Sequence, residues 1–404
     1  MNQFIARQPI FDNQMRVYAY ELLHRFNDEK NTAGDIRDPD RASSETMMTS
    51  FHSIGIEKIT GGKRAFVNFT ERLLETGVAT LFPSEYLVVE VLENVQPTES
   101  VLTACRQLKR DGYLLALDDF VLKDELRPLL SLADIIKIDW LHTPMEDIPA
   151  LVSSLKEFSL LLLAEKIETK EAYHTAASMG FTLFQGYFFS KPTILHKKKA
   201  EPLKAHYLQL IRLAQHEDAE FSALARIIRR DAVLTYRLLR LVNSVYFGMQ
   251  YEVNDIQNAL AILGLKEIRK WISLLVMMGV CADKTDELVS ISLIRGRVLE
   301  LYCLSYLSPS DAGNYFMIGL FSLLDVILDS HMDEVMSELS VPLEVSRSLT
   351  VGQGTAADLL RLLADYERGR WDAAREHCDR LRLSTEDMSK LYLEAVLWCG
   401  ELST

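Results

Sequence analysis

The sequence contains no apolar run of about eighteen residues, the length an α-helix needs to span a bilayer, so we expect no membrane partner. Its first residues lack a basic segment followed by an apolar stretch and a small-residue cleavage site, which argues against export. The five cysteines are scattered without metal-type spacing, and this pattern fits reduced thiols better than a disulfide framework. We therefore expect a cytoplasmic protein.

The sequence also contains fewer basic than acidic residues. The chain of 404 residues has 44 Lys and Arg against 57 Asp and Glu, which gives a formal net charge of −13. A protein that binds nucleic acid over a broad surface needs a basic face. The charge balance gives no support to such a surface, and we expect no DNA partner.

The first half of the chain alternates strand-like apolar runs with amphipathic helical patterns. Four of these runs are EYLVVEVLE, LLALDDF, ADIIKIDW and LLLLAEKIE. Such alternation predicts parallel strands with right-handed crossovers, and roughly eight strands in about 190 residues predict a closed (β/α) barrel of the TIM type. Residues 3–11 and 15–23 form a predicted hairpin around Asp12-Asn13-Gln14, so one strand of the barrel is expected to run antiparallel.

The second half has a different pattern, which begins after Pro192. Segment 196–202, HKKKAEP, is charged and ends in proline, as linkers often do. Beyond it, apolar residues recur at spacings of three and four, which predicts helices, and no strand pattern returns. We therefore predict a barrel over 1–195, a linker over 196–202 and an all-α domain over 203–404.

Polar side chains occur at the carboxyl ends of at least six of the predicted strands. In a (β/α) barrel these ends meet at one mouth, where ligands bind. Carboxylates crowded together there repel one another unless cations neutralise them, and carboxylate and amide oxygens suit hard ions such as Mg²⁺ or Mn²⁺. A lone pair such as Asp118-Asp119 is more often a capping feature. Six strands together nevertheless predict a metal site, formed by Glu21, Asn68, Glu90, Asp118, Lys137 and Glu165.

These motifs, in this order, resemble the EAL domain family, the phosphodiesterases of cyclic di-GMP. The segments that carry the resemblance are ARQPIFD, YAYELLHR and IGIEKITGGKRAFVNF, and the triplet that names the family reads Glu-Leu-Leu at 21–23. The helical half is similar to the HDOD domain family through RRDAVLTYRLLRLVNSVYFG and IQNALAILGLKEIRKWISLLVMMG. The resemblance implies the architecture of bacterial EAL-HDOD signalling proteins, which is α/β plus all-α. An EAL-type TIM-like barrel with an antiparallel opening strand is followed by a helical HDOD domain.

The resemblance also implies a role for each residue of the site. The family chemistry is hydrolysis of cyclic di-GMP to pGpG with two Mg²⁺ or Mn²⁺ ions. The matching metal ligands are Glu21, Asn68, Glu90 and Asp118, and Asp119 and Glu165 serve the second ion. Lys137 stands near the attacking water, and Glu165 is the candidate general base because a carboxylate held close to that water can take its proton. Arg25, Gln185 and Glu168 are expected to contact the substrate, and Glu93 to anchor a loop.

The segment after the Asp-Asp pair departs from the family pattern. In active members the pair is followed by Phe-Gly and a loop with glycine and serine, whereas here Val121 replaces the glycine and such a loop is missing from 120–128. Valine resists backbone conformations with φ > 0 that glycine allows. Lys166 also stands where many members have glycine. Two functions therefore stay open: a phosphodiesterase, or a degenerate barrel that acts as a cyclic di-GMP sensor or protein-interaction scaffold.

The helical half lacks the residues for catalysis of its own. No histidine of the chain is followed directly by aspartate, so the dipeptide with which HD-type phosphohydrolases bind metal is missing. We expect this half to bind a protein partner and to regulate or localise the barrel. The resemblance also leaves a homodimer open. No motif in the sequence identifies the protein partner, the input signal or the cellular process that is controlled.

Overall fold

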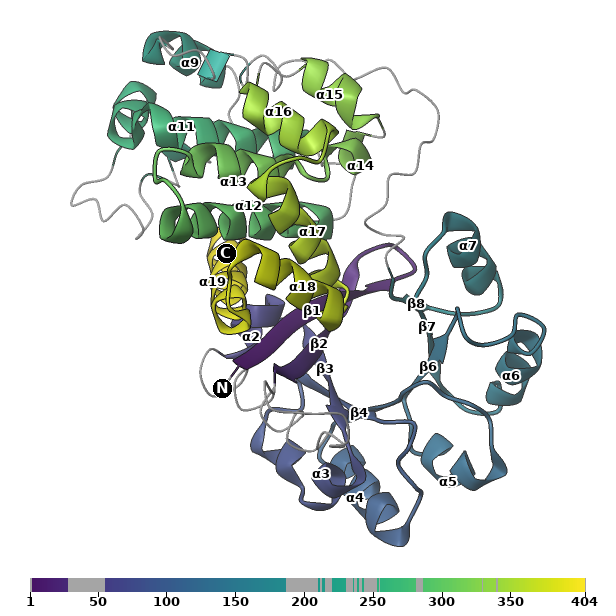
Figure 1. Cartoon of the computed structure of the whole chain (residues 1–404). Coiled ribbons are helices and arrows are strands. Elements are labelled where there is room, and N and C mark those ends of the chain that lie inside the picture. Colours follow the sequence, from purple (N-terminus) through teal and green to yellow (C-terminus); the bar gives the residue numbers. More distant parts are fainter. Residues whose placement is uncertain are drawn as a thin grey trace. The chain divides into compact units, whose positions relative to one another are not determined.

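The chain is described here from a computed structural model (Figure 1). It forms two compact units, of which the first joins Met1–Lys191 to Leu362–Thr404 and the second is Pro192–Arg361. The predicted linker 196–202 lies outside the described residues, which are 2–27, 55–186, 210, 213–214, 220–229, 235, 238–239, 242, 253, 255–280, 286–328, 330–338 and 341–403.

Eight strands close into a barrel in the order of the sequence, as predicted (Figure 1). β1 runs antiparallel to both of its neighbours, β2 and β8, and the other neighbouring strands pair in parallel. The prediction of an antiparallel opening strand is thus confirmed. The strands are β1 Asn2–Asp12, β2 Val17–Asn27, β3 Arg64–Phe69, β4 Leu87–Val91, β5 Leu114–Leu117, β6 Ile135–Asp139, β7 Leu161–Glu165 and β8 Leu183–Phe184.

The opening hairpin turns where the sequence predicts. The Asp12 carboxylate accepts hydrogen bonds from the backbone N–H groups of Gln14 and Arg16, at 2.8 and 2.9 Å, which satisfies donors that the strand ladder leaves free. Met15 adopts a left-handed conformation with φ 62° and completes the turn. Ten residue pairs then join β1 to β2, from Asn2↔Asn27 to Phe11↔Val17.

Helices cover the outside of the barrel between its parallel strands (Figure 1). The longest of them, α4, begins after Thr98, whose hydroxyl accepts a hydrogen bond from the Val101 N–H group, and α7 is capped by Thr169 in the same way. These elements are α2 Ile56–Thr60, α3 Glu71–Glu75, η2 Val78–Leu81, α4 Glu99–Arg110, η3 Asp124–Leu126, α5 Arg127–Leu130, α6 Ile148–Leu155 and α7 Lys170–Ser178.

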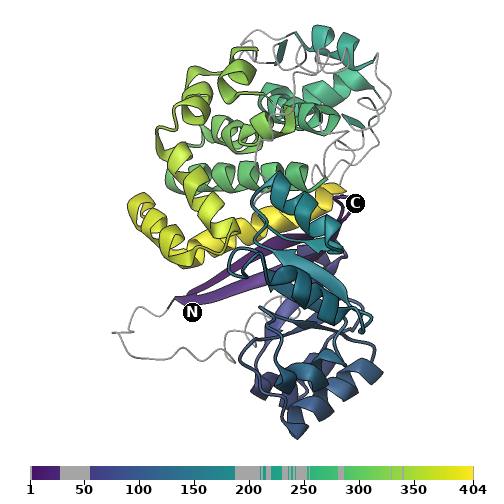
Figure 2. The same ribbon diagram turned by 90° about the vertical axis from the view of Figure 1, so that its right-hand side faces the viewer.

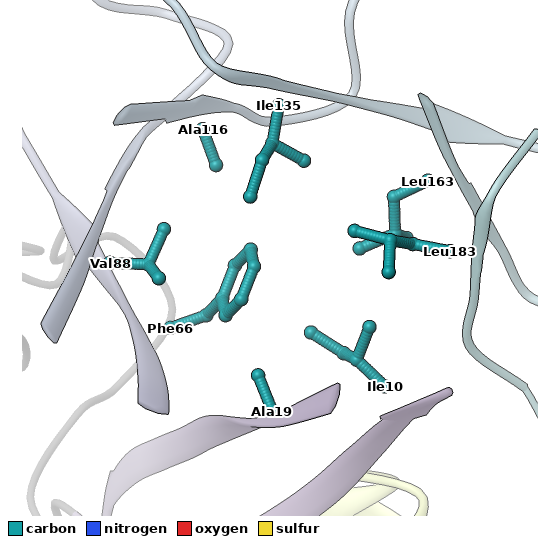
Figure 3. Close-up of a cluster of buried hydrophobic side chains, with 8 residues drawn as sticks. All are labelled: Ile10, Ala19, Phe66, Val88, Ala116, Ile135, Leu163 and Leu183. Carbon is teal, nitrogen blue, oxygen red and sulfur yellow. The ribbon is translucent and has the colours of Figure 1, made fainter. Parts of the chain in front are cut away.

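The interior of the barrel is filled by one apolar side chain from each strand (Figure 3). Side chains alternate along a strand, so every second residue points into a barrel. The largest member is Phe66, which is fully buried. This apolar set consists of Ile10, Ala19, Phe66, Val88, Ala116, Ile135, Leu163 and Leu183.

All the elements described in the second unit are helices, in agreement with the predicted all-α half. α12 and α13 pack against each other, and Phe316 and Phe321 of α13 are buried. No helix of the described residues is long and apolar enough to cross a membrane. The elements are α9 Phe221–Ile228, α11 Ile256–Val280, α12 Asp286–Tyr306, α13 Ala312–Phe321, α14 Leu324–Leu328, α15 Met332–Glu338 and α16 Leu343–Thr350.

The last helices of the chain pack on the barrel. α17, Thr355–Glu367, begins in the second unit and ends in the first, where α18, Trp371–Leu381, and α19, Thr385–Ser403, follow it. α19 lies against β1 and α2 (Figures 1 and 2). The sequence placed 203–404 in one helical domain, whereas the compact units place Leu362–Thr404 with the barrel.

The apolar set should dominate the stability of the barrel. Phe66→Ala removes a fully buried ring, and we expect the free energy of unfolding to fall by about 3–5 kcal/mol because a cavity replaces it. Urea unfolding followed by circular dichroism measures the change. The matched control is Leu81→Ala, where the side chain is 70% exposed and the expected change is within about 0.5 kcal/mol. Equal losses in the two variants would contradict the assignment of this core.

Candidate functional site

A second set of side chains stands two residues nearer the barrel mouth than the apolar set. The spacing of two keeps each of them on the inner side of its strand. On the seven parallel strands the step is toward the carboxyl end, and on the antiparallel β1 it is toward the amino end. This polar set consists of Gln8, Glu21, Asn68, Glu90, Asp118, Lys137, Glu165 and Gln185.

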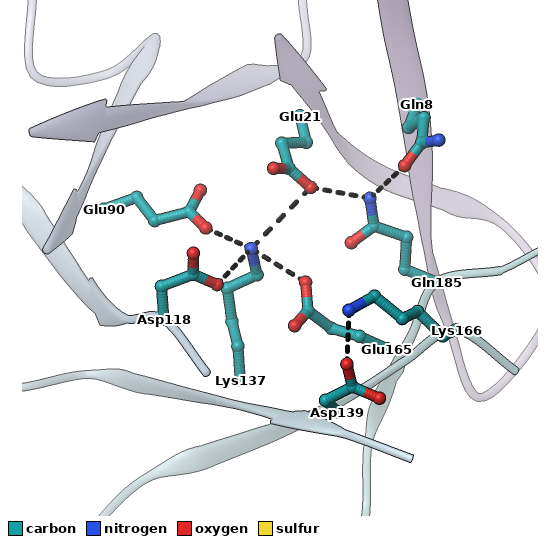
Figure 4. A network of polar contacts seen from close by, with 9 residues as sticks. All are labelled: Gln8, Glu21, Glu90, Asp118, Lys137, Asp139, Glu165, Lys166 and Gln185. Atoms are coloured by element: carbon teal, nitrogen blue, oxygen red, sulfur yellow. Dashed lines mark hydrogen bonds and ion pairs between the residues drawn. The ribbon is translucent and has the colours of Figure 1, made fainter. Parts of the chain in front are cut away.

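Lys137 lies at the centre of the polar set (Figure 4). Its side chain is 1% exposed. Its Nζ is paired with Glu90 Oε1, and three further carboxylates surround it. The Nζ–O distances are 2.8 Å to Glu165, 2.9 Å to Asp118 and 3.6 Å to Glu21. Four strands thus direct a carboxylate at one ammonium group, which leaves this group of five with three negative charges in excess when all are ionised.

The pKa values of this group reflect burial and mutual charge. Burial alone would lower the pKa of Lys137, but the four carboxylates outweigh it and hold that pKa well above its usual range. Burial raises the pKa of Glu90 well above its ordinary value. The charge of Lys137 lowers this pKa, whereas the neighbouring carboxylates raise it further. Burial likewise raises the pKa of Glu165 to about 7. The lysine stays charged, and excess negative charge is relieved by protonating a glutamate.

The carboxylates of Asp118 and Asp119 lie on the same side of the chain because strand β5 ends just before them. β5 ends at Leu117, and Asp119 takes a left-handed conformation with φ 40°. Adjacent side chains of a continuing strand would point apart. Here one carboxylate oxygen each of Asp118, Asp119 and Glu165 lie within 4.8 Å of one another. Three carboxylates at this separation are a donor set for a hard divalent cation.

Buried oxygen atoms of the polar set that lack a hydrogen-bond partner indicate whether a cation fits there. Asn68 Oδ1, Glu90 Oε2 and Gln185 Oε1 are buried without a hydrogen-bond partner. Asn68 and Glu90 are directly opposite each other in the β3–β4 register. A buried acceptor without a partner is costly, and an ion with oxygen ligands removes that cost. The donor chemistry therefore fits a hard divalent cation.

The structure also contains two polar features that the sequence reasoning did not assign to the site: the contact between Lys166 and Asp139, and the side chain of Gln8. Lys166 adopts φ 55°, and its ammonium pairs with Asp139, to which the His142 ring also bonds at 2.6 Å. Burial would raise the pKa of Asp139, but the bonds from His142 and Lys166 lower it to about 2. Gln8 is the other group, and its β1 position faces Glu21. The sequence could have indicated Asp139, because it follows Lys137 by two residues at the carboxyl end of a predicted strand. Gln8 lies within its strand, so no polar residue at a strand end pointed to it.

The remaining predicted site residues lie farther out or beyond the described part. Glu93 is exposed on the turn after β4, and Glu168 is half-buried after β7. The backbone of Arg25 pairs with Phe4 in β1, but its side chain is not among those described. Val121, 61% exposed, is not in the left-handed region, so the expected conflict between valine and φ > 0 does not arise there.

Comparison with known proteins matches both halves of the chain. A family model for the EAL domain matches residues 3–192, and one for the HDOD domain matches 201–298. The uncharacterized protein YuxH of Bacillus subtilis is 36% identical over 410 residues, covering 100% of this chain and 99% of that protein. The cyclic di-GMP phosphodiesterase CdgJ of Vibrio cholerae is 32% identical over 406 residues, covering 99% and 93%.

Solved structures of EAL-domain proteins match the chain at low sequence identity. The Bacillus subtilis YkuI protein, solved in complex with substrate cyclic di-GMP and calcium, is 19% identical, with a TM-score of 0.39. The match covers 64% of this chain and 71% of that one.

The raised pKa of Glu165 predicts a pH dependence of stability in metal-free protein. The folded state binds this proton more tightly than the unfolded chain, so the free energy of unfolding should fall as pH rises from about 4.5 to about 7. At ~1.4 kcal/mol per pKa unit the loss is on the order of 3 kcal/mol. Urea unfolding in EDTA at several pH values measures it.

Glu165→Gln should reduce this pH dependence by the contribution of Glu165, because the amide does not titrate, and the raised pKa of Glu90 leaves the remaining slope. The control is Glu157→Gln, whose side chain is 60% exposed and should leave the slope as it is in the wild type. A wild-type slope retained in Glu165→Gln would assign the titration to another group.

Proposed function

The chain belongs to the EAL domain family, in the group whose barrel is joined to an HDOD domain, and from this membership we propose that its barrel hydrolyses cyclic di-GMP to pGpG. The observation that carries the proposal is the convergence of Glu21, Glu90, Asp118 and Glu165 on buried Lys137, beside acceptor oxygens that lack a partner. A barrel kept only as a scaffold has no chemical need for this costly group of charges.

Mg²⁺ or Mn²⁺ is the proposed cofactor. Glu21, Asn68, Glu90 and Asp118 would hold one ion, and Asp119 and Glu165 would serve a second. When bound, two such ions supply Lewis-acid polarisation of the phosphodiester and stabilise the charge that develops during in-line displacement.

The protein residues supply the proton chemistry and the positioning. Glu165 has a pKa of about 7, so a substantial fraction of this carboxyl is ionised near neutral pH and can accept a proton. This property suits a general base for the attacking water. Lys137 keeps its charge and holds Glu165 at 2.8 Å, so it orients the base. Gln185 donates to Glu21 Oε2 at 2.7 Å and fixes that carboxylate. Substrate contacts are proposed for Arg25, Gln185 and Glu168, and loop anchoring for Glu93.

The segment after Asp119 favours a second candidate function. Val121 and Leu122 are exposed on the loop that follows β5, where the family's active members have a loop with glycine and serine. A barrel that binds cyclic di-GMP without turnover would be a sensor, and one that binds neither ion nor nucleotide would be a scaffold. In either case the helical half is proposed to bind a protein partner, with a homodimer as a further assembly and the cytoplasm as the location.

Turnover of cyclic di-GMP tests the proposed function. We expect the purified chain to form pGpG with Mg²⁺ or Mn²⁺, and Glu21→Ala to abolish the product because one oxygen ligand and the Gln185 contact are lost. Chromatography of the reaction measures both. Glu85→Ala, an exposed carboxylate on the barrel surface, is the matched control and should keep wild-type turnover. Binding of cyclic di-GMP without product would establish the sensor instead, and no binding the scaffold.

Lys166 should weaken the binding of the second ion. Its ammonium pairs with Asp139 and acts electrostatically on Asp119 and Glu165, so it repels a divalent cation there. We expect Lys166→Gln to raise Mn²⁺ affinity roughly three- to tenfold, measured by isothermal titration calorimetry. Lys156→Gln, at the exposed end of α6, serves as the control. Unchanged affinity in Lys166→Gln would show that the ammonium lies outside the field of the ion.

A further inference from the structure

We propose that Gln8 is a positioning residue through which the C-terminal segment Leu362–Thr404 holds the metal-binding side of the barrel in place. The functional part of this inference rests on the proposed ion site. The segment itself is unassigned by the family comparisons, because the matched regions are 3–192 and 201–298. Its role is therefore argued from its contacts within the first unit alone.

Gln8 is the β1 member of the polar set. It stands two residues before Ile10 of the apolar set and directly opposite Glu21 in the β1–β2 register. Because β1 runs antiparallel, this position reaches the same mouth as the carboxyl ends of the other strands. Figure 4 shows its side chain directed at Gln185. Gln8 thus occupies the place in β1 that Glu21 occupies in β2.

Three hydrogen bonds connect Glu21 to the end of α17. The Gln185 Nε2 group donates to Glu21 Oε2 at 2.7 Å and to Gln8 Oε1 at 2.9 Å. The Gln8 Nε2 group then donates to the backbone carbonyl of Glu367 at 3.1 Å. Each amide is fixed in orientation, because flipping Gln8 would set its oxygen against the Glu367 carbonyl oxygen and its Nε2 donor against the Nε2 donor of Gln185. The direction of donation along the whole chain of bonds is therefore determined by the Glu367 carbonyl.

The Glu367 carbonyl lies at the end of a helix. Glu367 is the last residue of α17, and the last four carbonyls of an α-helix lack partners within the helix. The turn that follows uses the carbonyls of Asp365 and Tyr366, which accept from Arg370 and Gly369 respectively. Gln8 supplies a donor to the carbonyl that comes next.

The chain at this turn packs closely on the opening hairpin. Gly369 adopts φ 68°, and a Cβ atom there would lie 2.9 Å from Cδ1 of Leu23 in β2. Tyr366 is wholly buried and packs its ring against Trp371 and Tyr392 of the same segment. Farther along, α19 lies on β1 and α2. The Glu367 carbonyl is thus held by a packed core on the outer side of the hairpin.

The arrangement makes the C-terminal segment part of the site. Displacing Glu367 removes the acceptor of Gln8, which frees the Gln8 amide to turn and leaves Gln185 without its second partner. Glu21 then loses the orientation of its Oε2 atom. A displacement of the end of α17 is therefore transmitted to the proposed metal ligand Glu21.

The first test uses metal-free protein and hydrogen exchange read by mass spectrometry. Gln8→Met keeps the length of the side chain and removes both polar contacts. We expect amide exchange to rise about fivefold or more both around Glu21–Leu23 and around Glu367–Arg370, because one lost link loosens both ends. Gln107→Met, whose amide bonds only to Asp111 on the surface of α4, is the matched control and should change neither region. A rise at one end alone, or at neither, overturns the proposal.

The second test measures Mn²⁺ binding and its effect on the C-terminal helices. We expect the Kd of Gln8→Met for Mn²⁺ to rise about fivefold. By reciprocity, Mn²⁺ should protect the end of α17 in the wild type and should not do so in Gln8→Met. The wild-type measurement keeps the proposal testable if the variant does not fold. Wild-type protein that binds Mn²⁺ without protecting α17 overturns the inference. Wild-type protein that binds neither Mn²⁺ nor Mg²⁺ overturns the proposed function, and metal-free exchange still decides the role of Gln8.

Discussion

The buried contact between Lys137 and four carboxylates is the interaction on which the rest of the barrel mouth depends. Neither partner could be buried alone, because a single charge in an apolar interior is far costlier than a paired one. The ammonium gathers carboxylates from β2, β4, β5 and β7. The apolar set beneath them excludes water from one side. The result is a concentrated negative charge whose position is set by a sheet closed on itself.

Much of this arrangement was predictable from the sequence, because it follows from two regular patterns. Alternating strands and helices predict the barrel, and polar residues at strand ends predict which side chains meet at its mouth. Glu21, Glu90, Asp118, Lys137 and Glu165 all follow that rule, and the structure brings them together. Their family roles as ligands, base and substrate contacts remain predictions, since the geometry bears on proximity alone.

What the sequence could not predict has physical reasons. Gln8 stands on the one antiparallel strand, so the rule that function lies at carboxyl ends points away from it. The left-handed conformation falls on Asp119 and Lys166 instead of Val121, because loop backbone is set by what the strands on both sides require. That Leu362–Thr404 belongs to the first compact unit does not follow from the sequence, since an amphipathic helix pattern gives the buried face but not its target.

The closure of the barrel is uneven around its circumference. β1 shares ten residue pairs with β2 but only two with β8, Phe11↔Phe184 and Asp12↔Leu183. The bond between Gln185 and Gln8 crosses this short boundary just where the strand ladder stops. The ladders between β5 and β6 and between β7 and β8 are equally short, so opening the sheet between β8 and the hairpin breaks as few backbone hydrogen bonds as opening it there. An opening between β8 and the hairpin differs from the other two because it widens the mouth beside Glu21 while the six parallel strand pairs stay intact.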